Sequence, residues 1–330
     1  MADQRTLNLL ITGGAGFIGV NLVHYFLKQK KYHVSVLDNL SSGNYDLLES
    51  IAQSCGVSVG EVFSPSSETL WFRRGDIRDK DVVDDVTAKQ DFVVHLAAQA
   101  GVIPSIENPF LDAEINVIGT LNLLESAVKS NIRKFIFASS AAPLGEQEPP
   151  LDESKVPRPL SPYGASKLAA EGYCSAFHGS FGLPTTVLRF SNVYGPHSFH
   201  KGSVIAHFIK RLLAGQSLVI YGDGEQTRDF LYVDDISRII AAILEDESGK
   251  TVGEVFQLGT GTETSVNQLV AILNRLAPAP MEIRFESERK GEIKRNYASP
   301  KKLFNTLGIK AETTLDTGIA KTWEWFAENK

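Results

Sequence analysis

A run of glycines directly after the first apolar segment constrains this chain more than any other feature. Leu7–Thr12 is followed by Gly13, Gly16 and Gly19, and a helical pattern begins within the run. In such a strand–turn–helix unit the first glycine permits a tight bend, the second lets a pyrophosphate approach bare backbone, and the third lets helix and strand pack closely. The helix N-terminus offers free N–H groups and the positive end of its dipole to phosphates. The spacing therefore predicts a dinucleotide-binding turn.

An acidic residue at the end of the next predicted strand indicates which dinucleotide is bound. Asp38 lies 19 residues after Gly19. A carboxylate at that place accepts hydrogen bonds from the ribose hydroxyls and repels a 2′-phosphate. The residues that follow, Asn39-Leu40-Ser41, supply no arginine to bind such a phosphate. A glycine triplet alone can also belong to a hairpin, but the two features together favour NAD over NADP.

Short apolar runs alternate with helix-length segments in the first half of the chain. This rhythm is typical of a parallel sheet with helices on both faces. The predicted strands are Leu7–Thr12, His33–Asp38, Thr69–Arg73, Phe92–Leu96 and Lys134–Ser139, and the predicted helices include Phe17–Lys30, Tyr45–Ser54 and Asp112–Ser130. Two of these strands are apolar almost throughout, as expected for strands buried on both faces. We predict an α/β fold with a Rossmann-type doubly wound parallel sheet.

The alternation loosens beyond about Tyr194. Shorter predicted strands and helices follow, at Val204–Ala214, Leu218–Tyr221, Val233–Leu244, Val255–Leu258, Val266–Arg275, Glu282–Phe285 and Leu315–Ala327. A chain of 330 residues has the length of about two domains. We expect residues 1–190 to form the dinucleotide-binding domain and residues 191–330 mainly a smaller α/β substrate lobe, with the chain crossing between the two.

Composition excludes several classes of function. Lys plus Arg is 33 against 39 for Asp plus Glu, and a net charge of −6 argues against a general binder of nucleic acid or anionic membranes. The two cysteines, Cys55 and Cys174, make no disulfide framework.

The start of the chain has neither the basic lead nor the apolar block of a secretory signal, so we expect a cytoplasmic protein. His197, His200 and His207 match no zinc spacing, and no metal is expected.

A tyrosine and a lysine with a separation of four residues suggest acid–base chemistry. Tyr163 and Lys167 open a predicted helix, so their side chains share one face. An ammonium group beside a phenol favours the phenolate and lowers the pKa of the phenol, and a positively charged nicotinamide would lower it further. Tyr297 and Lys301 have the same separation, but Pro300 between them argues against an aligned helical pair.

These motifs together resemble the extended short-chain dehydrogenases/reductases, a family of NAD-dependent nucleotide-sugar epimerases and dehydratases. The resemblance is carried, in order, by the glycine turn, Gly75–Asp79, His95–Ala98, Asn116, Ser139-Ser140, the Tyr163–Lys167 pair, Arg189–Pro196 and Tyr221–Phe230. It covers nearly the whole chain, from about residue 7 to about residue 327. The pattern is most similar to that of the UDP-glucose and UDP-N-acetylglucosamine 4-epimerases.

The resemblance implies roles for individual residues. The NAD-binding residues would be Gly13, Gly16, Phe17, Ile18, Gly19, Asp38, Asn39, Asp76, Ile77, Leu96, Ala97, Ala98, Gln99, Asn116, Tyr163 and Lys167. The residues that bind the nucleotide sugar would be Ser140, Asn192, Val204, Tyr221, Arg228, Arg289 and Asn296. Tyr163 would be the base, Lys167 would hold the ribose, and Ser140 would relay the proton. A homodimer through helices of the first domain is implied as well.

The segment after the fifth predicted strand separates the reactions of this family. Sugar-nucleotide 4,6-dehydratases carry an Asp-Glu pair where this chain has Ala141 and Ala142. Expelling water requires an acid and a base, and alanine supplies neither. The resemblance therefore implies 4-epimerisation of a UDP-hexose through a transient 4-keto sugar, with the hydride returned to its opposite face. A UDP-uronate epimerase, a dehydratase and a non-catalytic NAD sensor stay open as alternatives.

Three further positions bear on the sugar. Pro143-Leu144 replaces the usual Val-Tyr of the family, and Glu292 replaces an aspartate. Asn296 falls near the position whose bulk decides whether an N-acetyl group fits, and it is smaller than the tyrosine found there in other members. The physiological sugar, and UDP against dTDP as its nucleotide, are not decided by the sequence.

Overall fold

The computed structural model describes residues 6–63, 65–66, 68–277, 281–288 and 293–329. The chain forms two compact units, each built from three segments. The first unit comprises Met1–Gly145, Val156–Arg189 and Ile240–Phe256, and the second comprises Glu146–Lys155, Phe190–Ile239 and Gln257–Lys330. Each unit is described below by itself.

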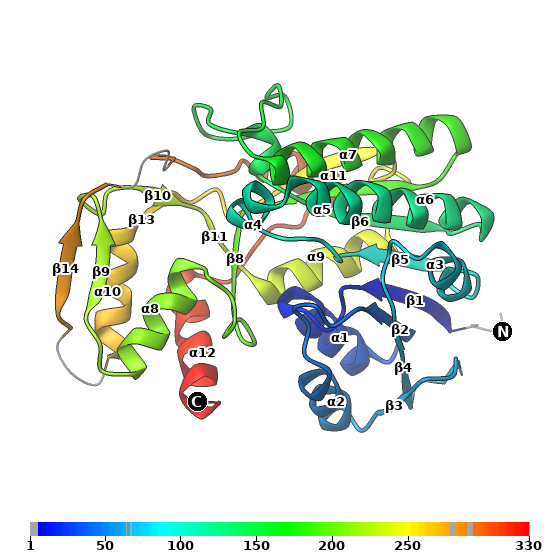
Figure 1. The fold of residues 1–330 in the computed structure, drawn as a ribbon, viewed down its shortest axis with the longest axis horizontal. Coiled ribbons are helices and arrows are strands. Elements are labelled where there is room, and N and C mark those ends of the chain that lie inside the picture. The colour runs from blue at the N-terminus through cyan, green and yellow to red at the C-terminus, as the bar shows by residue number, and fades with distance from the viewer. Residues whose placement is uncertain (1–5, 64, 67, 278–280, 289–292, 330) are drawn as a thin grey trace. The chain divides into compact units, whose positions relative to one another are not determined.

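A single large sheet forms the centre of the first unit (Figure 1). Its strands are β1 (Leu7–Thr12), β2 (Tyr32–Asp38), β3 (Ser58–Gly60), β4 (Thr69–Arg74), β5 (Phe92–His95), β6 (Lys134–Ser140), β7 (Thr185–Phe190) and β12 (Glu254–Leu258). Their order across the sheet is β12-β7-β6-β5-β1-β2-β4-β3, and the pairs between β6 and β3 are parallel. Strands β5 and β7 are buried along their whole length, as expected for inner strands of a sheet that is covered on both faces.

Helices cover both faces of this sheet. Helices α1 (Phe17–Gln29) and α2 (Tyr45–Ser54) pack together on one face, and α3 (Lys80–Thr87), α6 (Thr120–Lys129) and α7 (Pro162–Phe181) pack together on the other (Figure 1). A core of buried side chains joins the second group of helices to the sheet, with Phe135 and Phe137 of β6 fully buried. The predicted Rossmann-type fold is confirmed.

The long helix predicted at Asp112–Ser130 has a different form in the structure. It begins earlier, as α5 (Pro109–Ala113), where the Asn108 side chain accepts a hydrogen bond from the backbone N–H of Leu111. It then passes through a π-helical turn, η1 (Glu114–Gly119), before α6. One inserted residue in a helical turn does not erase the apolar periodicity, so the sequence pattern reads as one α-helix. A short helix α4 (Val102–Glu107) precedes α5.

The strand predicted at Val255–Leu258 forms in the structure, but as the outer strand β12 of the large sheet and not as part of the second lobe. Apolar pattern predicts that a strand exists, whereas its pairing partner is fixed by tertiary packing. A short strand, β3, also forms inside the segment that the sequence assigns to a loop.

The described part of the second unit contains three two-stranded sheets and several helices. The strand pairs are β8 (Asn192–Tyr194) with β11 (Phe230–Tyr232), β9 (Leu218–Tyr221) with β14 (Ile283–Glu286), and β10 (Thr227–Arg228) with β13 (Thr264–Ser265). The helices are α8 (Val204–Leu213), α10 (Val266–Leu276), α11 (Lys301–Leu307) and α12 (Leu315–Glu328), and α9 (Val233–Glu245) spans the boundary of the units. A core that includes Tyr194, Phe230 and Phe326 holds the unit together. Among the described helices none is both long and apolar enough to cross a bilayer.

Candidate functional site

The glycine turn lies where the strand order of the first unit reverses. Strand β1 pairs with β2 on one side and with β5 on the other, and ligands of open parallel sheets bind beyond the carboxyl ends of such strands. Gly13 follows β1 with a φ of +72°, and a Cβ there would lie 2.7 Å from the Ala97 nitrogen. The loops after β1 and β5 therefore touch, and glycine is required at Gly13 by both conformation and space.

The next two glycines of the turn differ in what surrounds them. A Cβ on Gly19 would lie 2.2 Å from the Gly13 carbonyl oxygen, whereas a Cβ on Gly16 would meet only that oxygen, at 3.4 Å. Gly16 caps α1 without a side-chain hydrogen bond, and no acidic residue stands in the first turn of the helix. Phe17 and Ile18 begin α1 and are half-buried. Bare backbone and an uncapped helix N-terminus form a cradle that fits a pyrophosphate.

The Asp38 carboxylate lies beside the glycine turn and is hydrogen-bonded to it. Oδ2 accepts a hydrogen bond from the Ala15 N–H at 2.9 Å, and Oδ1 accepts one from the Leu40 N–H at 2.8 Å. Burial raises the pKa of Asp38, and these two backbone hydrogen bonds oppose that rise. A Cβ on Gly43 would lie 2.9 Å from Oδ1, so the chain passes close over the carboxylate. The carboxylate is thereby fixed at the carboxyl end of β2, as a ribose ligand requires.

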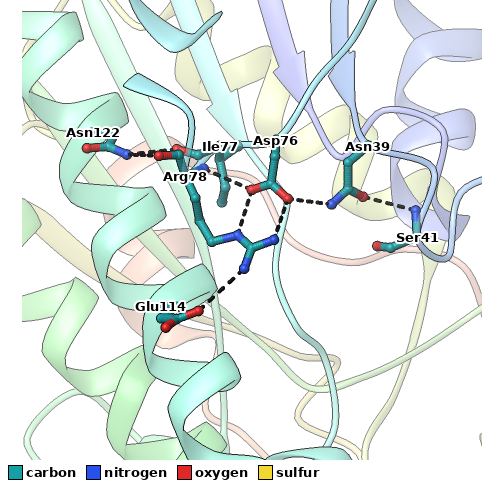
Figure 2. A network of polar contacts seen from close by, with 7 residues as sticks. All are labelled: Asn39, Ser41, Asp76, Ile77, Arg78, Glu114 and Asn122. Carbon is teal, nitrogen blue, oxygen red and sulfur yellow. Dashed lines mark hydrogen bonds and ion pairs between the residues drawn. The ribbon is translucent and has the colours of Figure 1, made fainter. Parts of the chain in front are cut away.

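A second carboxylate, Asp76, lies beyond β4 at the centre of a polar network (Figure 2). Arg78 donates from Nε to Oδ1 at 3.0 Å and from Nη2 to Oδ2 at 2.9 Å, and Asn39 Nδ2 donates to Oδ2 at 2.9 Å. These hydrogen bonds, led by those from Arg78, lower the pKa of Asp76 to about 2. Asn122 Nδ2 donates to the carbonyl of buried Ile77 at 3.0 Å, which ties the segment to α6.

The loop after β5 is fastened to the π-helical turn. Leu96, Ala97, Ala98 and Gln99 form this loop and are half-buried. The Gln99 N–H donates to Asn116 Oδ1 at 2.9 Å, and Asn116 Nδ2 lies 3.1 Å from the Gln99 carbonyl oxygen. Asn116 is buried and sits in η1, so the widened helical turn aims its amide at the loop.

A chain of hydrogen bonds that the sequence did not predict joins the same loop to the helix. His95 lies buried between two hydroxyls, with Nδ1 2.7 Å from Thr12 Oγ1 and Nε2 3.0 Å from Thr120 Oγ1. Because the Thr120 hydroxyl donates to the Asn116 carbonyl at 2.7 Å, His95 must donate from Nε2. Nδ1 then accepts from Thr12, whose oxygen receives the Ala97 N–H at 3.3 Å. Burial and the charge of Lys167 hold the pKa of His95 well below its usual value, so the ring is neutral.

Ser140 and Tyr163 come together from β6 and the start of α7. Ser161 caps α7 by accepting a hydrogen bond from the Gly164 N–H at 3.1 Å, and a Cβ on Gly164 would lie 2.6 Å from the Ala142 oxygen. This close approach brings the first turn of α7 to the segment after β6. Ser140 Oγ accepts from the Ala142 N–H at 3.1 Å and also makes a hydrogen bond with the Tyr163 phenol.

The electrostatics of Tyr163 differ from the expectation that its pKa is lowered. Burial raises the pKa of Tyr163, and the hydrogen bond from Ser140 opposes that rise. The charge of Asp112 raises the pKa further. Residue types alone reveal a neighbouring ammonium group but not the desolvation of the phenol, which has the larger effect in the protein itself.

Lys167 lies almost wholly inside the first unit, with 3% of its surface exposed. Its Nζ donates to the Ala138 carbonyl at 3.0 Å and stands 4.7 Å from the centre of the Phe137 ring. Burial lowers the pKa of Lys167 to about 8, although the carboxylates of Asp112 and Glu171 act to raise it. The lysine is thus a buried cation whose charge depends on nearby carboxylates.

Two further groups near the pair were missed from the sequence. Glu171 follows Lys167 by one helical turn and binds Arg189 of β7 through both carboxylate oxygens, at 2.9 and 2.6 Å. Asp112 of α5 has 1% of its surface exposed and lies against Asn116. The i, i+4, i+8 spacing of Tyr163, Lys167 and Glu171 was a signal that could have revealed the first group. No sequence signal marked Asp112.

Apart from Ser140, the predicted nucleotide-sugar residues that the structure describes lie on the second unit. Asn192 begins β8, Val204 begins α8, Tyr221 ends β9, Arg228 lies on β10, and Asn296 is half-buried in the segment before α11. Arg289 falls outside the described residues, as does Glu292. Arg228 donates from Nη1 to the carbonyls of Thr227 and Ile293, at 2.7 and 2.8 Å. Helix α11 begins at Lys301, so the prediction that Tyr297 and Lys301 form no aligned helical pair is confirmed.

A buried carboxylate organises the segments around Asn192. Asp229 is fully buried and accepts hydrogen bonds from the N–H groups of Thr260, Gly261 and Ala298 at 2.9, 3.2 and 3.2 Å. Its own carbonyl accepts from the Asn192 N–H at 3.0 Å. The sequence placed Asp229 in a motif without a role, and the structure shows that it joins several segments of the second unit.

Known proteins and a known protein family are similar to this chain over most of its length. Residues 9–259 match the model of the NAD dependent epimerase/dehydratase family. A protein of Methanocaldococcus jannaschii whose name refers to UDP-glucose 4-epimerase is 39% identical over 97% of this chain and 99% of its own. A UDP-glucuronate 4-epimerase of Thermodesulfobacterium geofontis is 35% identical over 97% of this chain and 96% of its own. A dTDP-glucose 4,6-dehydratase of Streptomyces antibioticus is 33% identical over 98% and 93%.

Solved structures of nucleotide-sugar epimerases are also similar to this chain. The UDP-glucose 4-epimerase of Thermotoga maritima, solved with UDP-glucose, has a TM-score of 0.86 and 36% identity, covering 98% of this chain and 99% of its own. The UDP-N-acetylglucosamine 4-epimerase of Methanobrevibacter ruminantium M1, in complex with UDP-N-acetylmuramic acid, has a TM-score of 0.87 and 32% identity, covering 98% and 99%. Relatives of several substrate classes are thus similar to almost the whole chain.

Proposed function

Because the chain belongs to the NAD dependent epimerase/dehydratase family, which acts on nucleotide sugars with NAD as cofactor, we propose that it is the 4-epimerase of a UDP-hexose. The substrates would be UDP-glucose and UDP-galactose, or their N-acetylated counterparts. The similarity to 4-epimerases over nearly the full chain supports this choice.

The observation that carries the proposal is the segment directly after Ser140. Ala141 and Ala142 stand there, followed by Pro143 and Leu144, which are buried in the 3-10 turn η2 (Ala142–Leu144). A dehydratase must protonate a leaving hydroxyl and remove a carbon-bound proton, which takes two ionisable groups beside the sugar. This segment brings none, so it supplies no acid–base pair to expel water from a 4-keto sugar. Return of the hydride to the other face of the 4-keto sugar would then complete a 4-epimerisation.

The side chains of the first unit supply the proton chemistry. Tyr163 takes the proton of the sugar O4 hydroxyl as the base, and it gives that proton back when the 4-keto group is reduced again. Ser140, hydrogen-bonded to the phenol, relays the proton. Lys167, as a buried cation, would favour the phenolate, and it would hold the nicotinamide ribose. Bound NAD would supply the hydride chemistry, as the acceptor of the C4 hydride and its donor on return.

The cradle described above would hold this cofactor. Gly13, Gly16 and Gly19 would receive the pyrophosphate with the first residues of α1, and Asp38 would bind the adenosine ribose. Asp76 and Ile77 would lie beside the adenine. On the second unit Asn192 and Arg228 would bind the nucleotide-sugar diphosphate, because a guanidinium group suits a diphosphate, and Tyr221 would stack on the base.

Acceptance of an N-acetyl group is proposed from one position. Asn296 is half-buried and has a shorter side chain than the tyrosine expected there in hexose-restricted members. The added space suits an N-acetylated sugar. Similar turnover of UDP-glucose and UDP-N-acetylglucosamine would support this, and strict rejection of the acetylated sugar would contradict it.

A homodimer is proposed from an exposed apolar surface of the first unit. Apolar side chains on α4, α5 and η1 stand out from the helices, with exposed fractions of 46% for Val102, 70% for Ile103, 61% for Ile106, 82% for Phe110 and 50% for Ile118. Such a cluster on neighbouring helices marks a protein interface. A second copy of the chain, with the same surface, is the partner that a two-fold interface requires.

The deciding experiment is proton NMR of the purified protein with UDP-glucose and, separately, with UDP-N-acetylglucosamine, without added reductant. We expect galacto-configured anomeric signals that grow to a constant ratio. A 4-keto-6-deoxy product would mean that the argument from Ala141 and Ala142 is wrong. If neither sugar changes, the same assay with UDP-glucuronate and dTDP-glucose separates a different substrate from a non-catalytic NAD sensor.

A further inference from the structure

The Asp112 carboxylate lies inside the first unit beside the groups assigned to the reaction, yet it has no role in the scheme above. It is 1% exposed, and Oδ1 accepts a hydrogen bond from Asn116 Nδ2 at 2.9 Å. The same amide nitrogen lies 3.1 Å from Ser166 Oγ, and the Ser166 hydroxyl donates to the Tyr163 carbonyl at 3.1 Å. A short path of polar contacts therefore leads from the carboxylate to the backbone of Tyr163.

The charge of Asp112 acts on both members of the Tyr163–Lys167 pair. After desolvation, Asp112 has the largest influence on Lys167, whose pKa it raises, and it also raises the pKa of the Tyr163 phenol. The other carboxylate near Lys167 belongs to Glu171, which is already bound at both oxygens by Arg189. The hydrogen-bonding groups that act on Asp112 are neutral, the Asn116 amide and the Ser166 hydroxyl, so more of its negative charge is available to the pair.

We propose that Asp112 is a positioning residue for the Tyr163–Lys167 pair, which fixes the Asn116 amide and supplies the buried negative charge against which Lys167 stays protonated. A carboxylate that is buried without a cation bound to it costs free energy, and burial raises the pKa of Asp112 accordingly. The neighbouring ammonium group offsets that cost. The inference rests on the proposed roles of Tyr163 and Lys167, but not on the identity of the sugar.

The other elements packed on α5 bring few competing charges. From α7 the side chains that act on Asp112 are those of Ser166 and Lys167, and from η1 that of Asn116. Glu114 of η1 is exposed and pairs with Arg78 at 3.4 Å. The remaining neighbour, α4, carries Glu107 as its single titratable residue, and that side chain is exposed. Replacing the Asp112 carboxylate by an amide therefore removes the main negative charge that acts on the pair from this side.

The first test needs no substrate. The NAD-bound protein and its Asp112→Asn variant are titrated by the ultraviolet absorbance of phenolate, each against the same protein with Tyr163→Phe, so that the difference isolates Tyr163. Loss of the negative charge favours the phenolate, and we expect its titration midpoint to fall by about one pH unit. Asp112→Ser, which also lacks the charge but can accept from Asn116, is the second variant in case the first does not fold. An unchanged or higher midpoint overturns the proposal.

The second test is the pH profile of turnover. Because the charge of Asp112 raises the pKa of both groups, its removal should move both limbs of the profile to lower pH, whereas a purely structural role would scale the profile without moving it. Asp85→Asn, an exposed aspartate of α3 in the same unit, is the matched control and should leave the profile in place. A protein that turns over no tested UDP-sugar contradicts the proposed function alone, since the phenolate titration still decides the role of Asp112.

Discussion

Glu171 and Arg189 form a bidentate ion pair inside the first unit, with 2.9 Å from Arg189 Nε to Oε1 and 2.6 Å from Nη2 to Oε2. Both side chains are almost wholly buried, at 5% and 6% exposure. Ser139 Oγ donates to the same carboxylate at 2.5 Å. The pair thus joins α7, β7 and β6 directly behind Ser140, Tyr163 and Lys167.

Breaking this pair should destabilise the protein strongly. Glu171→Ala leaves the Arg189 cation buried without a counterion, which costs about 3–5 kcal/mol. The free energy of unfolding, measured in urea, should fall by that amount. The control is Glu245→Ala, which removes an exposed pair with Lys31 at 2.8 Å and should cost far less. Equal losses for the two variants would contradict the prediction.

Tyr163→Phe should abolish turnover and leave the cofactor bound. The variant removes the phenolic oxygen alone, so turnover should fall at least about 10²-fold while the NAD released on denaturation stays equimolar with protein. Turnover is followed by NMR of the UDP-sugar, and bound NAD by chromatography. Retained turnover would show that the proton has another acceptor.

Alanine substitutions at two glycines of the turn should have different effects, one on folding and the other on cofactor binding. A Cβ on Gly19 would clash with backbone at 2.2 Å, whereas a Cβ on Gly16 would meet only one oxygen at 3.4 Å. We therefore expect Gly19→Ala to lower the melting temperature sharply. Gly16→Ala should melt near the wild-type temperature but retain less NAD after purification, because its methyl group occupies the pyrophosphate side of the turn. The reverse order of effects would contradict the assigned geometry.

Protonation of Asp76 at low pH should lower the stability of the folded protein. Its pKa in the folded protein is about 2, below the usual value, so the stability that it contributes is present above about pH 4 and lost as the pH falls toward 2. With a partly exposed partner, Asp76→Asn should cost about 1 kcal/mol at pH 7. That difference should shrink between pH 4 and pH 2 in urea titrations. A difference that does not change with pH would rule out the ion pair as its source.

Phe110 should be required for the proposed dimer. Phe110→Asp places a charge on the exposed apolar surface of α5, and light scattering after gel filtration should then give the mass of one chain. Val62→Asp is the matched control, because Val62 is 81% exposed against 82% for Phe110 but lies outside α4, α5 and η1. Dimers in both variants, or a monomeric wild type, would contradict the proposal.

The parts of the fold that the sequence predicts are those set by local chemistry. Gly13 is required for the bend of the turn, Gly19 for close packing, and Asp38 lies at a strand end. Each of these features can be recognised from a few neighbouring residues. Strands β1, β2, β4, β5 and β6 were predicted from their apolar runs, whereas the buried strand β7, which contains Thr185, Thr186 and Arg189, was not. The partners of Glu171 were not predicted either, because Arg189 and Ser139 lie 18 and 32 residues away and meet it only across the sheet.

The burial of side chains and the pairing of strands could not be predicted from the sequence. The raised pKa of Tyr163 follows from desolvation, which depends on everything packed around the phenol. The π-helical turn that holds Asn116 differs from an α-helix by one residue, which leaves the apolar periodicity almost unchanged. The partner of β12 is decided by the rest of the sheet, so its strand was predicted but its place was not.

The first unit is built from three separate segments, and this affects both its folding during synthesis and the design of a fragment that contains it. Its outer strand β12 and the second half of α9 are synthesised only after residues 190–239 of the second unit. During translation the large sheet therefore stays one strand short until the ribosome has passed residue 258. A fragment that ends at residue 190 leaves the edge of β7 bare, and an exposed strand edge promotes aggregation. An expressible NAD-binding fragment must carry residues 240–258 as well, joined through a linker or a circular permutation.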